Sequence, residues 1–401
     1  MIPQLRIRTE YSFRTNYGPL GVVADRLQEI GCPLAGIVDT GGTWGHVQWE
    51  KATAKVGIQP AFGGEVTIPQ EDGRKPRCWV LAADPASFYR LMSAKPSSVA
   101  EMAAAKGVIR FAGAALSDPD AFDYIDVNPR SIRATKRAIA LHQHTGKPLV
   151  LTADNDYPRP ADRLRFLAWD DSKRMTIQHI PTDAEFAAAM SWIGDEYYQQ
   201  ALRGTYEVAE RLQGIKLRRA PIINVPGDLL QMAVAGRDYR LAKGHIKEWT
   251  NEYHARFERE MELIKDKQYE SYFIVVADLI AWAKEHMLVG PGRGSSAGSL
   301  VCYLLRITEV DPLVHHLIFE RFIDVNRFDL PDIDIDFNDQ KREMVFEYLA
   351  DKYGRECVAR IGSVNRLKPR SVIAHVAKKL GIPQGAAFSV INVLVDFSSG
   401  D

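Results

Sequence analysis

The first 150 residues alternate short apolar runs with segments whose apolar residues recur at helical spacing. The runs LAGIVD (34–39), CWVLAA (78–83) and PLVLTAD (148–154) have the length and composition of buried strands, and the pattern predicts helices at 20–31 and 130–145. Strands that alternate with helices are typical of an α/β layer or barrel. We therefore predict an α/β domain in this part of the chain.

Helical patterns dominate the middle of the chain. Residues 182–214 read as helices, and the proline-rich stretch 218–228 has the composition of a connector. Residues 229–288 are again helical, and 272–287 carries enough apolar residues at helical spacing for a buried helix. We place a domain boundary near residue 220. The two predicted domains span 1–220 and 221–401.

Three aspartates alternate with apolar residues in LPDIDIDFND (330–339). In an extended strand the apolar side chains would share one face, and Asp332, Asp334 and Asp336 would share the other. Aspartate is depleted in strands, and like charges on one strand face repel each other unless a positive group lies between them. Two interpretations are open: an acidic face in contact with water, or a site for a divalent cation such as Mg²⁺, which prefers carboxylate and phosphate oxygens.

Length, charge and cysteine spacing narrow the class of protein. The 401 residues suffice for two or three domains, and 51 basic residues balance 51 acidic ones, so no overall field draws the chain to nucleic acid or to a membrane. The four cysteines form no C-x-x-C pair, which indicates reduced thiols. The start MIPQLRIRTEYS has arginines where a signal peptide needs an apolar run, and no apolar stretch reaches the length of a membrane span. We expect a cytoplasmic protein with no membrane partner.

A glycine-rich loop precedes a short apolar helix in VGPGRGSSAGSLVCYLL (289–305). The N–H groups at a helix N-terminus suit a phosphate, and glycine permits close approach of the backbone. The loop lacks the G-K-[ST] ending of a Walker motif, and by itself it is equally consistent with a tight turn. Arg293, Ser295 and Ser296 in the loop, together with the downstream aspartates, favour a phosphate cradle beside a metal site.

The segment 351–380 is basic, with eight lysine or arginine residues against two acidic ones. Such a segment is often a solvated helix face. Beside a phosphate and metal site, it favours contact with a nucleic-acid backbone. The predicted DNA contacts are Arg366, Lys368 and Arg370.

Taken together, these motifs resemble the bacterial replicative DNA polymerase III alpha subunits, also called C-family DNA polymerases. The resemblance runs nearly continuously from Tyr269 to Phe337, through SYFIVVADLIAWAK, VGPGRGSSAGSLVCYLLRITEVDPL, LIFERFIDVNR and LPDIDIDF. It implies a polymerase β-like nucleotidyltransferase palm of α+β fold in 221–401. It also implies a polymerase and histidinol phosphatase (PHP) domain, an α/β barrel, in 1–220. The implied ligands are two Mg²⁺ ions, a dNTP and primer-template DNA.

The resemblance also implies roles for individual residues. Asp334 and Asp336 look like the two metal-binding catalytic aspartates, with Asp332 in a supporting role. Gly294 and Ser295 look like the pair that holds the incoming triphosphate. Further neighbours of the triphosphate would be Arg293, Ser296 and Arg321.

The PHP-like part departs from the family pattern at its metal ligands. The family's opening H-x-H is RIR (6–8) in this chain, and Thr40 stands where a histidine commonly follows the aspartate of IVDTGG (37–42). TADNDY (152–157) has acidic and amide residues where the family often has histidine. Arginine stays protonated and cannot ligate a cation.

Asp39, Glu65 and Asp154 remain as candidates for a weak carboxylate site in this first domain. Because the histidines are lost, we expect the domain to be structural, without hydrolase or proofreading activity.

The third catalytic aspartate of the family lies on a palm strand beyond Asp401. The alternatives are a split gene whose second polypeptide supplies that aspartate, the fingers and the clamp-binding region, a truncated form, or a protein that has lost catalysis. We predict part of a DNA-directed DNA polymerase that joins dNTP to a primer 3′-OH by two-metal nucleotidyl transfer and needs a further polypeptide. The alternative function is a non-catalytic module, derived from an alpha subunit, that binds DNA or the replisome. A metal-dependent phosphoesterase is the least favoured, because its ligands are the ones that changed.

Overall fold

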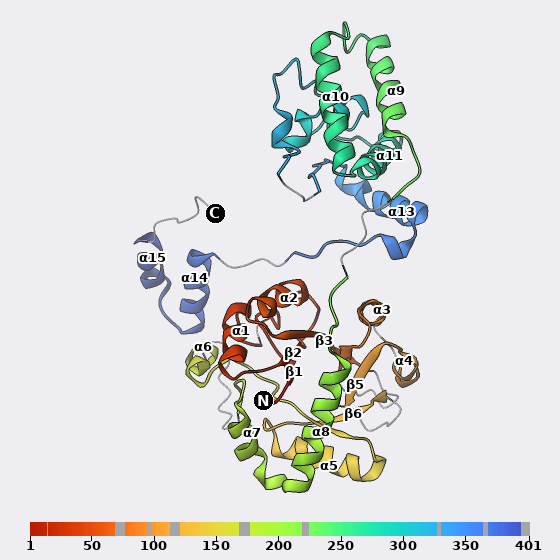
Figure 1. The fold of residues 1–401 in the computed structure, drawn as a ribbon. Helices are drawn as coiled ribbons and strands as arrows, with labels where there is room; N and C mark the ends of the chain where they lie inside the picture. The colour runs from red at the N-terminus through yellow and green to blue at the C-terminus, as the bar shows by residue number, and fades with distance from the viewer. Residues whose placement is uncertain are drawn as a thin grey trace. The chain divides into compact units, whose positions relative to one another are not determined.

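A computed structural model describes residues 1–13, 15–68, 77–94, 96, 98–112, 121–167, 177–218, 224–326, 330–363 and 368–393. The chain divides into two compact units (Figure 1). They are Met1–Arg219 together with Ile373–Asp401, and Ala220–Val372. The break after Arg219 lies beside the boundary expected from the sequence, whereas the last segment groups with the first unit. The domain extents 1–220 and 221–401 stay predictions.

One mixed sheet of seven strands forms the centre of the first unit (Figure 1). The strands pair in chain order and are β1 (Gln4–Ile7), β2 (Leu34–Ile37), β3 (Gln59–Thr67), β4 (Arg77–Ala82), β5 (Val108–Ala112), β6 (Tyr124–Val127) and β7 (Leu149–Leu151). β4 is antiparallel to β3 and β5, and the other neighbouring pairs are parallel. The predicted α/β class is confirmed. Among the described strand pairs, none closes the sheet into the barrel that the resemblance implies.

Eight α-helices accompany the sheet in the described residues between 1 and 218. They are α1 (Leu20–Glu29), α2 (His46–Lys55), α3 (Pro85–Ala94), α4 (Val99–Ala104), α5 (Ile132–Thr145), α6 (Arg163–Leu167), α7 (Asp183–Met190) and α8 (Asp195–Arg211). The helices predicted at 20–31, 130–145 and 182–214 are confirmed as α1, α5, and α7 with α8. Side-chain caps mark where two of these helices begin. The Ser131 hydroxyl accepts a hydrogen bond from the Ala134 N–H at the start of α5, and the Thr182 hydroxyl accepts one from the Glu185 N–H at the start of α7.

The sheet is covered on both faces, which explains why its strands read as continuous apolar runs rather than alternating ones. Every residue of β2, β6 and β7 is buried. α8 packs so closely on β7 that a Cβ on Gly204 would lie 2.1 Å from the Leu149 carbonyl oxygen. The predicted strands at 34–39, 78–83 and 148–154 are confirmed as β2, β4 and β7.

The second unit is helical in its described part. Its helices are α9 (Leu229–Ala242), α10 (Asn251–Asp266), α11 (Glu270–His286), α12 (Leu300–Leu304) and α13 (Arg342–Tyr353), with 3₁₀ turns η4 (Gly294–Gly298) and η5 (Phe319–Arg321) between them. α11 is the predicted buried helix, and all five residues of α12 are buried behind the glycine-rich loop. The last described helices of the chain are α14 (Pro369–Lys379), which lies within the basic segment 351–380, and α15 (Gln384–Val393).

The aspartate stretch is extended but is not a regular strand, so that part of the prediction is wrong. Among the described residues it makes only two isolated bridges, Arg293 with Asp334 and Val289 with Phe337. The partner segment departs from strand conformation between these bridges, because Gly292 has φ +122°. The α+β palm sheet implied by the resemblance is therefore not seen in the described part of this unit.

The predicted two-sidedness of the stretch is confirmed. Ile333 and Ile335 pack against the apolar core of the second unit, while Asp332 and Asp336 are exposed. Of the helices in the described residues, none combines the length and the apolar character needed to cross a bilayer.

Candidate functional site

The glycine-rich loop meets the aspartate stretch at Arg293. Its Nη2 lies 3.1 Å from Asp334 Oδ1, and its Nε lies 3.4 Å from Asp336 Oδ1. The positive group expected beside the carboxylates is thus present. The side chain of Arg293 is 60% exposed and that of Asp336 62%, so these ion pairs are screened by water and each is worth less than about 1 kcal/mol. Weak pairs of this kind leave the carboxylates open to a competing cation.

Glycine permits the loop to lie directly against the carboxylates. Gly294 has φ +70°, and a Cβ on it would lie 2.4 Å from Asp334 Oδ2. A Cβ on Gly290 would lie 3.0 Å from the Cβ of Asp336. A side chain at Gly294 would be strained by the backbone and blocked by the carboxylate, which explains glycine at this position.

The predicted triphosphate neighbours fall into two groups. Ser295, Arg321 and Asp332 line one cavity of about 380 Å³. Ser296 is buried and its hydroxyl donates a hydrogen bond to the Arg293 carbonyl oxygen at 3.0 Å, so it shapes the loop. The structure thus brings a hydroxyl and a guanidinium group to one cavity, next to the loop that touches Asp334.

The predicted DNA contacts are only partly described. Lys368 and Arg370 are exposed at the beginning of α14. Arg366 lies outside the described residues.

The donor set at Asp334 and Asp336 fits a hard divalent cation. Mg²⁺ is commonly held by one or two carboxylates together with substrate phosphates and water. No group of three or more histidine, cysteine, aspartate or glutamate side chains suited to a metal occurs in the described part of the chain. A cation here would therefore take its remaining ligands from substrate or solvent.

Arginines lie among the carboxylates of the first unit. Arg6 Nη1 lies 3.0 Å from Asp126 Oδ2, and Arg6 Nη2 lies 3.0 Å from Glu65 Oε1. Arg8 Nη2 lies 2.8 Å from Glu65 Oε1 and 3.1 Å from Asp154 Oδ1. None of these five side chains is more than 11% exposed. We call them the arginine–carboxylate cluster.

The carboxylates of the candidate site, Asp39, Glu65 and Asp154, are bonded to protein donors in this structure. Glu65 and Asp154 pair with Arg8, and Asp39 accepts hydrogen bonds from the Thr9 N–H and the Ser12 hydroxyl at 2.7 and 2.6 Å. The guanidinium groups supply the positive charge that metal ions would bring, and they cannot ligate a cation. These residues do not fit the metal centre that the resemblance implies.

Two charged residues beside the loop were missed from the sequence. Glu260 of α10 is fully buried and holds the loop that leads into α12, and Arg256 pairs with it. A charged pair one helical turn apart is ordinary on a helix surface, so the sequence has no signal that distinguishes this pair.

Several known proteins are similar in sequence to this chain. Residues 229–399 match the family model described as the bacterial DNA polymerase III alpha NTPase domain. The chain is similar to proteins named DNA polymerase III subunit alpha. The relative from Aquifex aeolicus (strain VF5) is 32% identical over 65% of this chain and 24% of its own length. The relative from Caulobacter vibrioides (strain NA1000 / CB15N) is 28% identical over 95% of this chain and 39% of its own length.

These matches point to a class, the bacterial replicative polymerase subunits. Within it, they support similarity of most of this chain to the DNA polymerase III alpha family. The chain spans well under half the length of these relatives.

Among solved structures, an amidohydrolase from Chromobacterium violaceum is similar over 45% of this chain and 93% of its own chain. The identity is 12% and the TM-score is 0.31, which is a weak similarity.

Proposed function

We propose that the second unit is the nucleotide-binding and catalytic part of a DNA-directed DNA polymerase, with dNTP and primer-template DNA as substrates. The observation that carries the proposal is the contact of the glycine-rich loop, through Arg293 and Gly294, with Asp334 and Asp336. The names of the relatives, DNA polymerase III subunit alpha, support the same activity.

In this proposal Asp334 and Asp336 hold Mg²⁺, which when bound supplies electrostatic stabilisation of the phosphoryl group during in-line displacement. Gly294 keeps the loop against Asp334 so that its backbone N–H groups can meet a phosphate. Ser295 and Arg321, which share a cavity, donate hydrogen bonds to phosphate oxygens. Each of these residues binds or orients the triphosphate.

We further propose that Arg366, Lys368 and Arg370 contact the DNA backbone. The exposure of Lys368 and Arg370 supports this role. For the first unit we propose a PHP-like fold with a structural role and no hydrolase activity, because the arginine–carboxylate cluster leaves no ligand set for a metal among the described residues.

Primer extension by this chain, measured on a primed template with dNTPs and Mg²⁺, tests the proposed function. Without a cation, the two carboxylates would repel the negatively charged triphosphate. We therefore expect that dNTP binding requires Mg²⁺ and that EDTA abolishes it. Extension would follow directly if the chain carries all the carboxylates it needs. Binding of dNTP without primer extension would match the expectation that a second polypeptide supplies a third carboxylate. DNA binding with no detectable dNTP binding would instead favour the non-catalytic module.

Replacing Gly294 with alanine is expected to weaken Mg²⁺-dependent dNTP binding about tenfold or more. The added Cβ would displace the carboxylate of Asp334, which lies 2.4 Å from its position, and would also suffer the strain of φ +70°. Gly244→Ala is the matched control, because Gly244 has φ +71° but open space around its Cβ position. Equal dNTP affinities in the two variants would show that the contact with Asp334 is irrelevant to binding.

A further inference from the structure

α10 carries a buried carboxylate behind the glycine-rich loop. Glu260, which is fully buried, accepts hydrogen bonds from Arg256 Nε at 2.5 Å and from the Ser299 hydroxyl at 2.8 Å. It also accepts from the backbone N–H groups of Leu300 and Val301, each at 3.0 Å. These N–H groups lie in the first turn of α12, where a helix leaves its donors unpaired. One carboxylate therefore binds the first two N–H groups of α12 and the Ser299 hydroxyl, which itself accepts from the Cys302 N–H.

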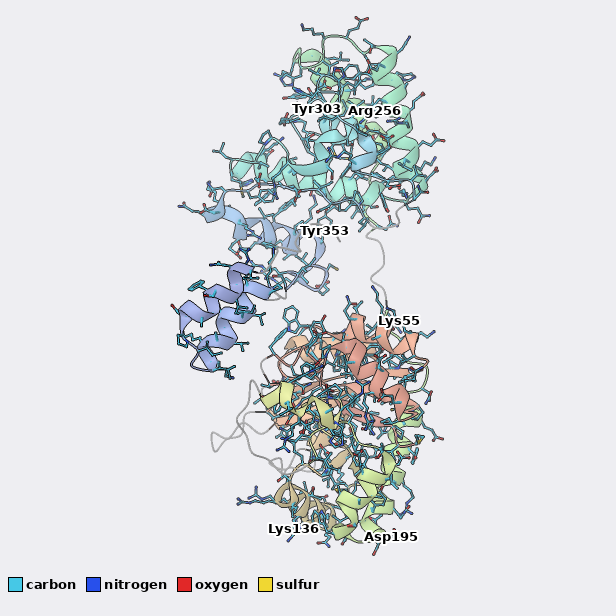
Figure 2. The ribbon with its side chains drawn as sticks, turned by 90° about the vertical axis from the view of Figure 1, so that its left-hand side faces the viewer. Lys55, Lys136, Asp195, Arg256, Tyr303 and Tyr353 are labelled. Atoms are coloured by element: carbon cyan, nitrogen blue, oxygen red, sulfur yellow. The ribbon has the colours of Figure 1, made fainter. Side chains whose placement is uncertain are left out.

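Arg256 extends this contact to a second loop. Its Nη2 donates to the carbonyl oxygens of Gly298, at 2.5 Å, and Leu317, at 3.2 Å. Gly298 is the last residue of η4, the turn that contains Ser295, and Leu317 directly precedes the segment that leads to Arg321. Figure 2 labels Arg256 in the second unit.

The two loops also contact each other. A Cβ on Gly298 would lie 2.8 Å from the Ile318 carbonyl oxygen, so the backbones of the two segments touch at this point. Ser295 and Arg321 line the same cavity, whereas neither Arg256 nor Glu260 lines it. Arg256 and Glu260 thus bond to both loops that line the cavity without lining it themselves.

We propose that Arg256 and Glu260 are positioning residues that set the separation of Ser295 and Arg321 for binding of a nucleoside triphosphate. The proposal rests on the proposed function. A fully buried carboxylate that accepts from four donors has essentially one arrangement, since any donor left unpaired away from water is destabilising. The charge-assisted bonds of Glu260 and Arg256 reach backbone groups and hence fix the course of both loops.

Glu260→Gln in the full chain tests the proposal. The amide keeps the shape of the carboxylate, but its NH₂ group must face a donor such as the Leu300 or Val301 N–H, which displaces the beginning of α12. We expect the Kd for dNTP with Mg²⁺ to rise about tenfold or more, with the Kd for primer-template DNA unchanged. Glu258→Gln is the matched control, because Glu258 lies on the same helix with its side chain 67% exposed, and we expect wild-type binding.

The outcomes separate this proposal from the proposed function. If the wild type binds dNTP and Glu260→Gln binds it equally well, the positioning role is overturned while the proposed function stands. Absence of dNTP binding by the wild type would overturn both proposals.

Arg256→Lys keeps the charge but has fewer hydrogen-bond donors. This variant tests the positioning role if Glu260→Gln does not fold. We expect it to weaken dNTP binding about threefold, and wild-type affinity would overturn the role. Circular dichroism verifies that each variant compared is folded, because a merely structural role would lower stability and leave the affinity of the folded protein unchanged.

Discussion

Replacing Asp334 with asparagine is expected to reduce the proposed primer extension about a thousandfold or more. The amide has the shape of the carboxylate but lacks the charge that holds a divalent cation, and the stabilisation that such a cation supplies is worth several kcal/mol of barrier. The measurement is single-turnover extension of a labelled primer, with DNA binding measured in parallel. DNA binding should be retained, because the proposed phosphate contacts, Lys368 and Arg370, lie outside this site.

The stability of Asp334→Asn should stay close to that of the wild type. The ion pair that it removes is exposed, with Arg293 60% and Asp334 36% exposed, and such pairs contribute little. A large loss of activity with a small loss of stability would identify a functional carboxylate. Asp351→Asn is the control, since Asp351 is 75% exposed and pairs only distantly with Arg355. Extension by Asp334→Asn at near the wild-type rate would refute the catalytic assignment.

Replacing Arg6 with methionine is expected to destabilise the first unit by about 3–5 kcal/mol, because it leaves buried carboxylates without their counter-charge. Burial by itself would lower the pKa of the Arg6 guanidinium, but Asp154, Asp126 and Glu65 outweigh it and raise that pKa above its usual value. Arg6 is therefore charged in the folded protein. Urea unfolding followed by circular dichroism measures the loss, and Arg159→Met, which breaks a partly exposed pair with Glu29, should cost less than about 1 kcal/mol.

The destabilisation of Arg6→Met should shrink as the pH falls. Burial raises the pKa of Asp126, and Arg6 counteracts that rise. Without Arg6 the folded-state pKa moves further above the unfolded value, so the folded state takes up a proton that the unfolded state releases. Stability is then lost as the pH rises through the folded-state pKa, and the variant should be closest to the wild type near about pH 5 and furthest from it near neutral pH. An equal loss at both pH values would show that Asp126 does not take up this proton.

The cluster also predicts the response to metals. We expect that Mn²⁺, Zn²⁺ and EDTA leave the unfolding midpoint of the first unit unchanged in the wild type, because guanidinium groups already neutralise Glu65, Asp126 and Asp154. A midpoint that rises with either metal would contradict a purely ionic cluster.

Local sequence determined much of the fold and of the candidate site. Periodicity alone predicted the helices α1, α5, α8 and α11 and the strands β2, β4 and β7, because each element buries a face or a run that its own residues define. The motif around Arg293 to Ser296 and the alternation of Asp332 to Phe337 were also readable, since each lies within one short segment. The predicted sidedness of the aspartate stretch depends only on the period of two residues.

Tertiary structure alone decided which distant charges meet. The ladder of the aspartate stretch is interrupted where its partner segment has φ +122° at Gly292, and the stretch itself holds no trace of that. The sequence showed that Arg6 stands where the family has a metal-ligating histidine. Only the folded sheet shows that Arg6 lies between Asp126 and Glu65, two residues that are distant from it in the sequence. Glu260 resembles any surface glutamate until the fold buries it against the N-terminus of α12. The physical reason is common to all three: hydrogen bonding and counter-charge depend on distances through space, whereas the sequence reports only the neighbours along the chain.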